Sequence, residues 1–297
     1  MSGAPASGNS RGTGSRWSRF LGAGILPRVV VALIGAPLLV WIGWVGGWFF
    51  LAAVHLVILL GLREFYQLAH ARGYGSYRTI GMIGGLGLAL VQSLRPEWTN
   101  GAVTLLFFVV TVSELARRDG GRALAHAAVT LFGVIYVAWL GAHIVVLREW
   151  APVAGPASAG LRALGFAVLM TWCYDTFAYM VGVAVGRHPL LERVSPKKSR
   201  EGALGGLVMT GLFGYGASLW FAAPLFSPWE GALLGLVCAV AAQLGDLVES
   251  LFKRDAGLKD TADLLPGHGG VLDRFDSLLF TVPLVYYVLA LGLVGTS

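Results

Sequence analysis

Long apolar stretches separated by short polar clusters make up most of this 297-residue chain. A helix needs roughly 20 predominantly apolar residues to cross the hydrocarbon core of a bilayer. Cutting the chain at its polar clusters and Gly/Pro breaks therefore predicts an all-α polytopic membrane protein with about nine spans. Their approximate limits are 29–46, 48–68, 79–94, 100–116, 123–147, 161–183, 203–222, 229–249 and 275–294.

The basic residues give an independent test of these limits. Positive charge gathers in cytoplasmic loops, so it should fall in alternate connections if every segment spans. Of the 22 Lys and Arg residues, 19 lie in the N-terminal tail and in alternate connections, and only Arg95, Arg148 and Arg162 lie on the other side. This distribution predicts a cytoplasmic N-terminus and a C-terminus on the opposite side. We expect a bacterial cytoplasmic (inner) membrane.

Composition divides the chain into three parts. Residues 1–28 are rich in Gly, Ser and Arg and predict a disordered basic cytoplasmic tail. A cleaved signal peptide is not expected, because the apolar run that follows is too long for one. Residues 29–158 hold about five membrane helices. Residues 159–297 hold about four more, with polar cytoplasmic loops at roughly 184–202 and 250–274. At 56% hydrophobic and 13% charged residues the chain is too apolar for a soluble globule, so any chemistry is expected at the membrane surface.

Acidic side chains inside apolar segments indicate where that chemistry lies, since a charge at membrane depth costs on the order of 3 kcal/mol. Asp175 lies in the middle of the predicted 161–183 span. Asp246 shares a helical face with Gln243, Glu249 and Ser250. A polar stripe of this kind favours a cavity, because lipid would not accept it.

Seven of the 16 acidic residues fall between Asp246 and Asp276, interspersed with basic residues. This mixture predicts a site for a metal ion and a polyanion, in which carboxylates hold a hard cation such as Mg²⁺ and Lys or Arg binds phosphate oxygens. The alternative is a solvated loop with exchanging ion pairs. The glycines within 266–270 favour the site, since a Gly-rich turn leaves backbone N–H groups open to an anion.

The other polar loop contributes the sequence from Ser195 to Gly202, with Lys197 and Lys198 at its centre. Basic and hydroxyl groups that lead into a helix N-terminus are typical of a phosphate site. The alternative is ordinary anchoring by positive charge on the cytoplasmic side. The chain has neither a P-loop motif nor a dinucleotide-binding fingerprint, and no nucleic-acid partner is expected.

These motifs resemble those of the phosphatidate cytidylyltransferase (CDP-diacylglycerol synthase) family. The resemblance rests on Ser250-Leu-Phe-Lys-Arg, Lys259-Asp260, Pro266-Gly-His-Gly-Gly and Asp273-Arg-Phe-Asp276 at their fixed spacings, and on blocks that begin at Asp175 and Ser195. It covers about residues 160–276. It implies that CTP and phosphatidic acid react to give CDP-diacylglycerol and pyrophosphate, with Mg²⁺ required and a second, monovalent cation left open.

In this reaction the attacking group is already a lipid phosphate anion, so the enzyme mainly has to align two anions and neutralise their repulsion. As a hypothesis, Asp246 and Asp273 bind the metal, and Glu249, Asp260 and Asp276 are further ligands. Asp175 either forms a second cation site or orients a lysine of the other loop.

The remaining expected site residues bind phosphate groups or act beside them. His268 is either a general acid or, as we favour, a hydrogen-bond donor. Lys253 and Arg254 are placed with Asp246, Asp273 and His268 in the catalytic group. The expected substrate-binding groups are Ser195, Lys197, Lys198, Ser250, Lys259, Arg274 and the backbone amides of Gly269 and Gly270.

Two other functions fit part of this pattern. A CTP-dependent polyprenol or dolichol kinase would also join a nucleotide to a membrane lipid, but it would release CDP. A proton- or cation-coupled transporter would also bury acids in spans, but it predicts an internal repeat, and the sequence has none. The small residues from Gly81 to Gly87 permit a homodimer contact, although packing within the chain is favoured.

Overall fold

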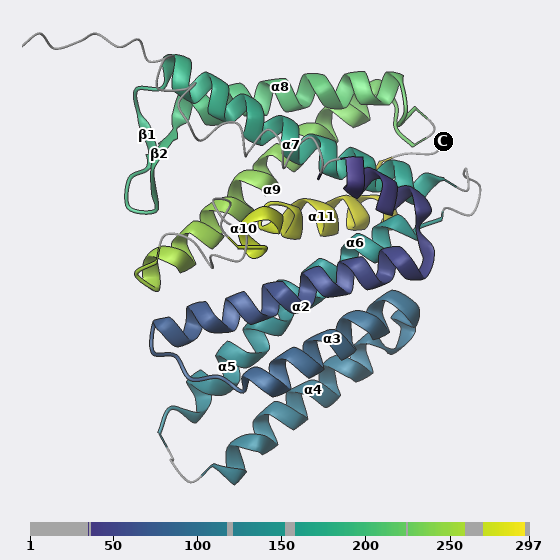
Figure 1. Ribbon diagram of the computed structural model, residues 1–297. Helices are drawn as coiled ribbons and strands as arrows, with labels where there is room; N and C mark the ends of the chain where they lie inside the picture. The colour runs from purple at the N-terminus through teal and green to yellow at the C-terminus, as the bar shows by residue number, and fades with distance from the viewer. Residues whose placement is uncertain are drawn as a thin grey trace, which may run out of the picture. The chain divides into compact units, whose positions relative to one another are not determined.

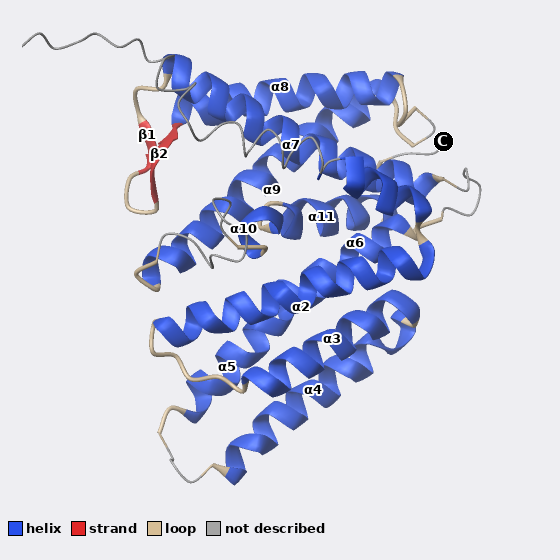
Figure 2. Ribbon diagram, viewed as in Figure 1, coloured by secondary structure: helices blue, strands red, loops and turns tan. Residues whose placement is uncertain are grey.

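The fold was obtained as a computed structural model. It describes residues 35, 37–117, 121–151, 158–223, 225–258 and 270–294. The chain divides into two compact units, Met1–Trp41 and Ile42–Ser297, and all the elements named below belong to the second. Nearly all of their regular structure is helical, as the predicted all-α class requires (Figure 1, Figure 2).

The helices follow the predicted spans closely from 48–68 onward. The N-terminal half contains α2 (Gly47–Ala71), α3 (Arg78–Leu94), η1 (Pro96–Trp98), α4 (Thr99–Ser113), η2 (Glu114–Ala116), α5 (Ala123–Gly133), η3 (Val134–Trp139) and α6 (Leu140–Arg148). The η3 segment is a π-helix, so α5, η3 and α6 form one helical run. The C-terminal half contains α7 (Ala159–Val185), β1 (Pro189–Leu191), β2 (Ser195–Ser199), α8 (Arg200–Leu219), α9 (Pro228–Asp255), α10 (Leu272–Phe275) and α11 (Leu278–Ala290).

Six helices in the described part of the chain are long and apolar enough to cross a membrane. They are Gly47–Ala71, Pro96–Ala116, Ala123–Arg148, Ala159–Val185, Arg200–Leu219 and Pro228–Asp255. The helix Arg78–Leu94 is apolar but shorter. These helices support an all-helical membrane protein, while the count of nine spans and the orientation of the two termini stay predictions.

The predicted polar loops contain regular structure that the sequence pattern does not predict. Strands β1 and β2 pair antiparallel within 184–202, with Leu191 opposite Ser195, and lead directly into α8 (Figure 2). Helix α9 continues six residues past its predicted end at 249. Its last two turns are stabilised by i, i+4 contacts, from Ser250 to Asp246 and from Lys253 to Glu249.

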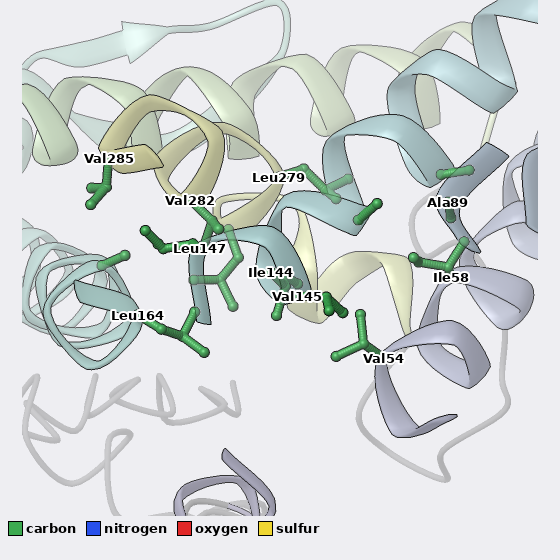
Figure 3. Close-up of a cluster of buried hydrophobic side chains, with 14 of the residues drawn as sticks. Val54, Ile58, Ala89, Ile144, Val145, Leu147, Leu164, Leu279, Val282 and Val285 are labelled. Carbon is green, nitrogen blue, oxygen red and sulfur yellow. The ribbon is translucent and has the colours of Figure 1, made fainter. Parts of the chain in front are cut away.

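The core lies between α2, α6 and α11. Figure 3 shows Val54 and Ile58 of α2, Leu147 of α6 and Leu279 and Val282 of α11 in one cluster. Helices α8 and α9 pack through small residues, since a Cβ on Gly235 would lie 2.6 Å from the Thr210 carbonyl oxygen. Such close backbone contact is typical of membrane helices, where small residues replace the hydrophobic driving force of water.

Candidate active site

The last third of α9 carries the polar stripe that the sequence predicts. The Ser250 hydroxyl donates to Asp246 Oδ1 at 3.2 Å, and Lys253 Nζ donates to Glu249 Oε2 at 2.8 Å. Helical spacing therefore places these four side chains along one side of the helix. Glu249 is almost completely buried, whereas Asp246 is partly exposed. The stripe thus runs from an accessible carboxylate to an inaccessible one.

Lys253 joins this stripe to α10. Its Nζ lies 2.5 Å from Asp273 Oδ1, and the backbone N–H of Gly270 donates to Asp273 Oδ2 at 2.8 Å. Partial burial would raise the pKa of Asp273, but the hydrogen bonds from Lys253 and Gly270 outweigh burial and hold the pKa below its usual range. Asp273 is therefore ionised at neutral pH, and it shares the Lys253 ammonium with Glu249.

Strand β2 supplies a second lysine to the stripe. Lys198 Nζ forms an ion pair with Asp246 Oδ2, which connects the hairpin to α9. The neighbouring Lys197 is exposed. Of the two predicted lysines, the structure thus brings Lys198 to the carboxylates. No contact joins Ser195 to them among the residues described.

Two further carboxylates complete the group. Asp276 follows α10 and is buried, with the Ser277 N–H donating to its Oδ1 at 2.6 Å. Asp276 also interacts electrostatically with the neighbouring Asp246 carboxylate. Asp175 of α7 interacts electrostatically with Asp246, Asp276 and Lys198. We call Asp175, Asp246, Glu249, Asp273 and Asp276 the acid cluster.

The acid cluster gathers five carboxyl groups around two lysines. Three of these carboxyl groups form ion pairs with the lysines: Asp246 with Lys198, and Glu249 and Asp273 with Lys253. In addition, Glu249 Oε1 is buried without a hydrogen-bond partner in the part of the chain that is described. Clustered carboxylate oxygens attract cations, and Asp and Glu oxygens are the ligands that Mg²⁺ prefers.

The cluster suits a divalent cation by charge and by ligand type, but its described side chains do not form a complete ligand set. No three His, Cys, Asp or Glu side chains within residues 37–258 and 270–294, as far as these are described, lie close enough together to hold a metal ion. The predicted ligand Asp260 lies outside the described residues, as do Lys259, His268 and Gly269.

Two predicted arginines lie at the accessible side of this region. Arg254 is exposed at the end of α9, with its Nε 3.4 Å from the Val194 carbonyl oxygen in the turn between β1 and β2. Arg274 is exposed on α10. The α8 N-terminus, part of the predicted phosphate site, is capped by Ser199, whose Oγ accepts from the Gly202 N–H at 3.1 Å.

Sequence reasoning missed two polar residues of the N-terminal half. Glu64 of α2 is fully buried and accepts hydrogen bonds from the backbone of Val271 and Leu272. Tyr136, in the π-helical segment η3, has a buried hydroxyl and interacts electrostatically with Glu249. Glu64 did carry a signal, since it is an acid inside the predicted 48–68 span. Nothing in the sequence distinguishes Tyr136 from its aromatic neighbours.

Comparison with known proteins identifies the family. The sequence model of the cytidylyltransferase family matches residues 26–292. The chain belongs to this family. The match includes the N-terminal helices as well as the acid cluster, so the cytidylyltransferase relationship extends over nearly the whole chain.

Individual cytidylyltransferases agree with this result. A phosphatidate cytidylyltransferase of Synechocystis sp. is 36% identical, and the matched region covers 89% of this chain and 96% of the relative. One from Staphylococcus epidermidis is 32% identical over 272 residues, covering 89% and 97%. The chloroplastic phosphatidate cytidylyltransferase 5 of Arabidopsis thaliana is 33% identical over 271 residues, covering 81% and 66%. The predicted enzyme class is therefore confirmed: the protein is a nucleotidyltransferase and not a transporter.

Proposed function

We propose that this protein transfers the cytidylyl group of CTP to phosphatidic acid, releasing CDP-diacylglycerol and pyrophosphate at the cytoplasmic side of a membrane. One observation carries the proposal: two lysines and five carboxyl groups gather around α9, a helix long and apolar enough to cross a membrane, in a member of the cytidylyltransferase family. A lipid phosphate and a water-soluble nucleotide could both reach such a site.

The chemistry requires one bond to form and one to break. An oxygen of the lipid phosphate attacks the α-phosphorus of CTP, and the bond from that phosphorus to the oxygen bridging the α- and β-phosphates breaks. Pyrophosphate leaves with the electron pair. Because the nucleophile is already an anion, no strong base is needed, and the protein contributes mainly alignment and charge neutralisation.

Lys198 is the residue best suited to bind a substrate phosphate. Its ammonium is partly exposed and has one carboxylate partner, Asp246, among the described residues. A phosphate oxygen could therefore replace that partner without leaving a fully buried charge behind. Lys253 is enclosed by Glu249 and Asp273 instead, so we assign it to orienting these two carboxylates.

A divalent cation, expected to be Mg²⁺, suits the carboxyl oxygens of the acid cluster. Asp246 and Asp276 would hold it, with Glu249 and Asp175 nearby. When bound, the ion would neutralise charge on the phosphates and help to orient them. Arg254 and Arg274 lie on exposed surface beside these residues, where further phosphate oxygens could be bound.

The position of a radiolabel tests this reaction directly. The purified protein would be supplied with phosphatidic acid in detergent micelles, Mg²⁺ and CTP labelled at either the α- or the γ-phosphorus. We expect the α-label to enter the lipid and the γ-label to enter pyrophosphate. A γ-label in the lipid, with release of CDP, would overturn the proposal in favour of a kinase.

A further inference from the structure

Glu64 is a buried acid that the proposed chemistry does not use. It lies on α2, in the N-terminal half of the chain, and its side chain is fully buried. Both of its carboxylate oxygens accept hydrogen bonds from consecutive backbone groups: the N–H of Val271 lies 2.8 Å from Oε1, and the N–H of Leu272 lies 2.7 Å from Oε2. These two amides form the start of α10.

The contact fixes both the position and the orientation of this backbone. Two acceptors on one rigid carboxylate define the directions of two successive peptide planes, and hydrogen bonds to a charged acceptor are stronger than those between neutral groups. Helix α10 has four residues, too few to be stable without external contacts. Leu272 is also buried against α2, where a Cβ on Gly61 would lie 3.9 Å from its Cδ1.

The same backbone carries the acid cluster. Asp273 follows Leu272 directly, and its carboxylate binds Lys253, which in turn binds Glu249. Asp276 lies one turn further along the chain. A displacement of α10 away from α2 would therefore move two carboxylates relative to α9. A change of about 1 Å in the placement of reacting groups can cost on the order of 100-fold in rate.

We infer that Glu64 is a positioning residue for the reaction, which holds α10 so that Asp273 and Asp276 face α9. This inference rests on the proposed function for its kinetic consequence, but the contact itself does not. It gives the N-terminal half of the chain a part in the active site, and it explains why a carboxylate is fully buried in a predominantly apolar helix.

The test compares Glu64→Gln and Glu64→Ala with the control Tyr66→Phe. Tyr66 lies two residues further along α2, is equally buried, and donates a 2.8 Å hydrogen bond to the Thr130 carbonyl oxygen. The control thus removes a buried hydrogen bond from the same helix without touching α10. Glutamine keeps the shape of the side chain but loses the charge and one of its two acceptors.

Two readouts are measured on each purified variant. Hydrogen exchange of the peptide covering residues 270–276 reports the contact without needing activity, and we expect faster exchange in both Glu64 variants but not in Tyr66→Phe. For kcat with CTP and phosphatidic acid, we expect a fall on the order of 10-fold to 100-fold in Glu64→Gln, with a smaller change in KM, and no change in the control.

Unchanged exchange in Glu64→Gln, or an unchanged kcat in that variant, would overturn the inference. An equal loss of kcat in Tyr66→Phe would overturn it as well, since it would reveal a general effect of destabilising α2. If Glu64→Ala does not fold, Glu64→Gln carries the test alone. Failure of the proposed function is recognised separately: the unmodified protein would then release no pyrophosphate, while the exchange experiment would still report on α10.

Discussion

Lys198 and Lys253 both bind the acid cluster, but in different surroundings. Lys253 has 14% of its side chain exposed and lies between Glu249 and Asp273, which are 1% and 10% exposed. Lys198 is 28% exposed and pairs with Asp246, which is 30% exposed. Breaking a buried pair leaves an uncompensated charge out of reach of water, whereas breaking a partly exposed pair lets water or another ion replace the lost partner.

The comparison indicates that the two lysines have different roles. Lys253 connects α9 to α10 and holds two carboxylates in place. Lys198 lies on the β1–β2 hairpin, where a phosphate can compete for it. The distinction can be tested because it predicts different ratios of lost activity to lost stability.

The largest loss of activity is expected at Asp246, which contacts Lys198 and interacts with Asp276. Asp246→Asn removes the negative charge that we propose binds the cation. It should lower the rate of pyrophosphate release by roughly 100-fold to 1000-fold. Its thermal unfolding midpoint should change little, because Asp246 is partly exposed. A rate close to that of the unmodified protein would remove Asp246 from the site.

Replacing Lys253 should affect stability as well as rate. Lys253→Met leaves Glu249 and Asp273 buried without their shared cation and should cost about 3 kcal/mol of stability. Adding Glu249→Gln should recover part of this loss, because it removes one of the uncompensated charges. Unfolding midpoints in a single detergent measure both effects. An unchanged midpoint in Lys253→Met would contradict the structural role.

Replacing Lys198 should lower activity with little effect on stability. We expect Lys198→Ala to reduce kcat/KM on the order of 10-fold and to change the stability by less than about 1 kcal/mol. Steady-state kinetics with CTP and phosphatidic acid varied in turn would identify the phosphate that Lys198 binds. A loss of stability as large as that of Lys253→Met would erase the distinction between the two lysines.

The smallest effect is expected at Lys197, the neighbour of Lys198 on the exposed side of β2. Lys197→Ala should leave kcat/KM within about twofold and stability within about 0.5 kcal/mol of the unmodified protein. It removes the same charge from the same strand and is therefore the matched control for Lys198→Ala. Equal losses in the two variants would indicate that the total positive charge of the hairpin, and not the Lys198 contact, is what counts.

The sequence predicted the helices well because a single physical requirement determines them. Any segment that crosses hydrocarbon has to be apolar over its whole length and has to satisfy its backbone hydrogen bonds internally. The predicted spans 79–94 and 161–183 therefore differ by no more than two residues at each end from Arg78–Leu94 and Ala159–Val185. The polar stripe of α9 was predictable from helical spacing in the same way.

Features that depend on contacts between distant segments were not predictable. The β1–β2 hairpin has short strands without alternating apolar residues, so no periodicity distinguishes it from a loop. Which of Lys197 and Lys198 faces Asp246 depends on the strand register. Glu64 accepts hydrogen bonds from backbone amides more than 200 positions further along the chain. No local sequence pattern indicates a contact between segments so far apart.

The most direct test of the whole account is the substrate dependence of pyrophosphate release by the purified, full-length protein. We expect release only when CTP, phosphatidic acid and Mg²⁺ are present together, with ATP or GTP unable to replace CTP. Release that does not depend on phosphatidic acid, or accumulation of CDP in place of pyrophosphate, would contradict cytidylyl transfer to a lipid phosphate.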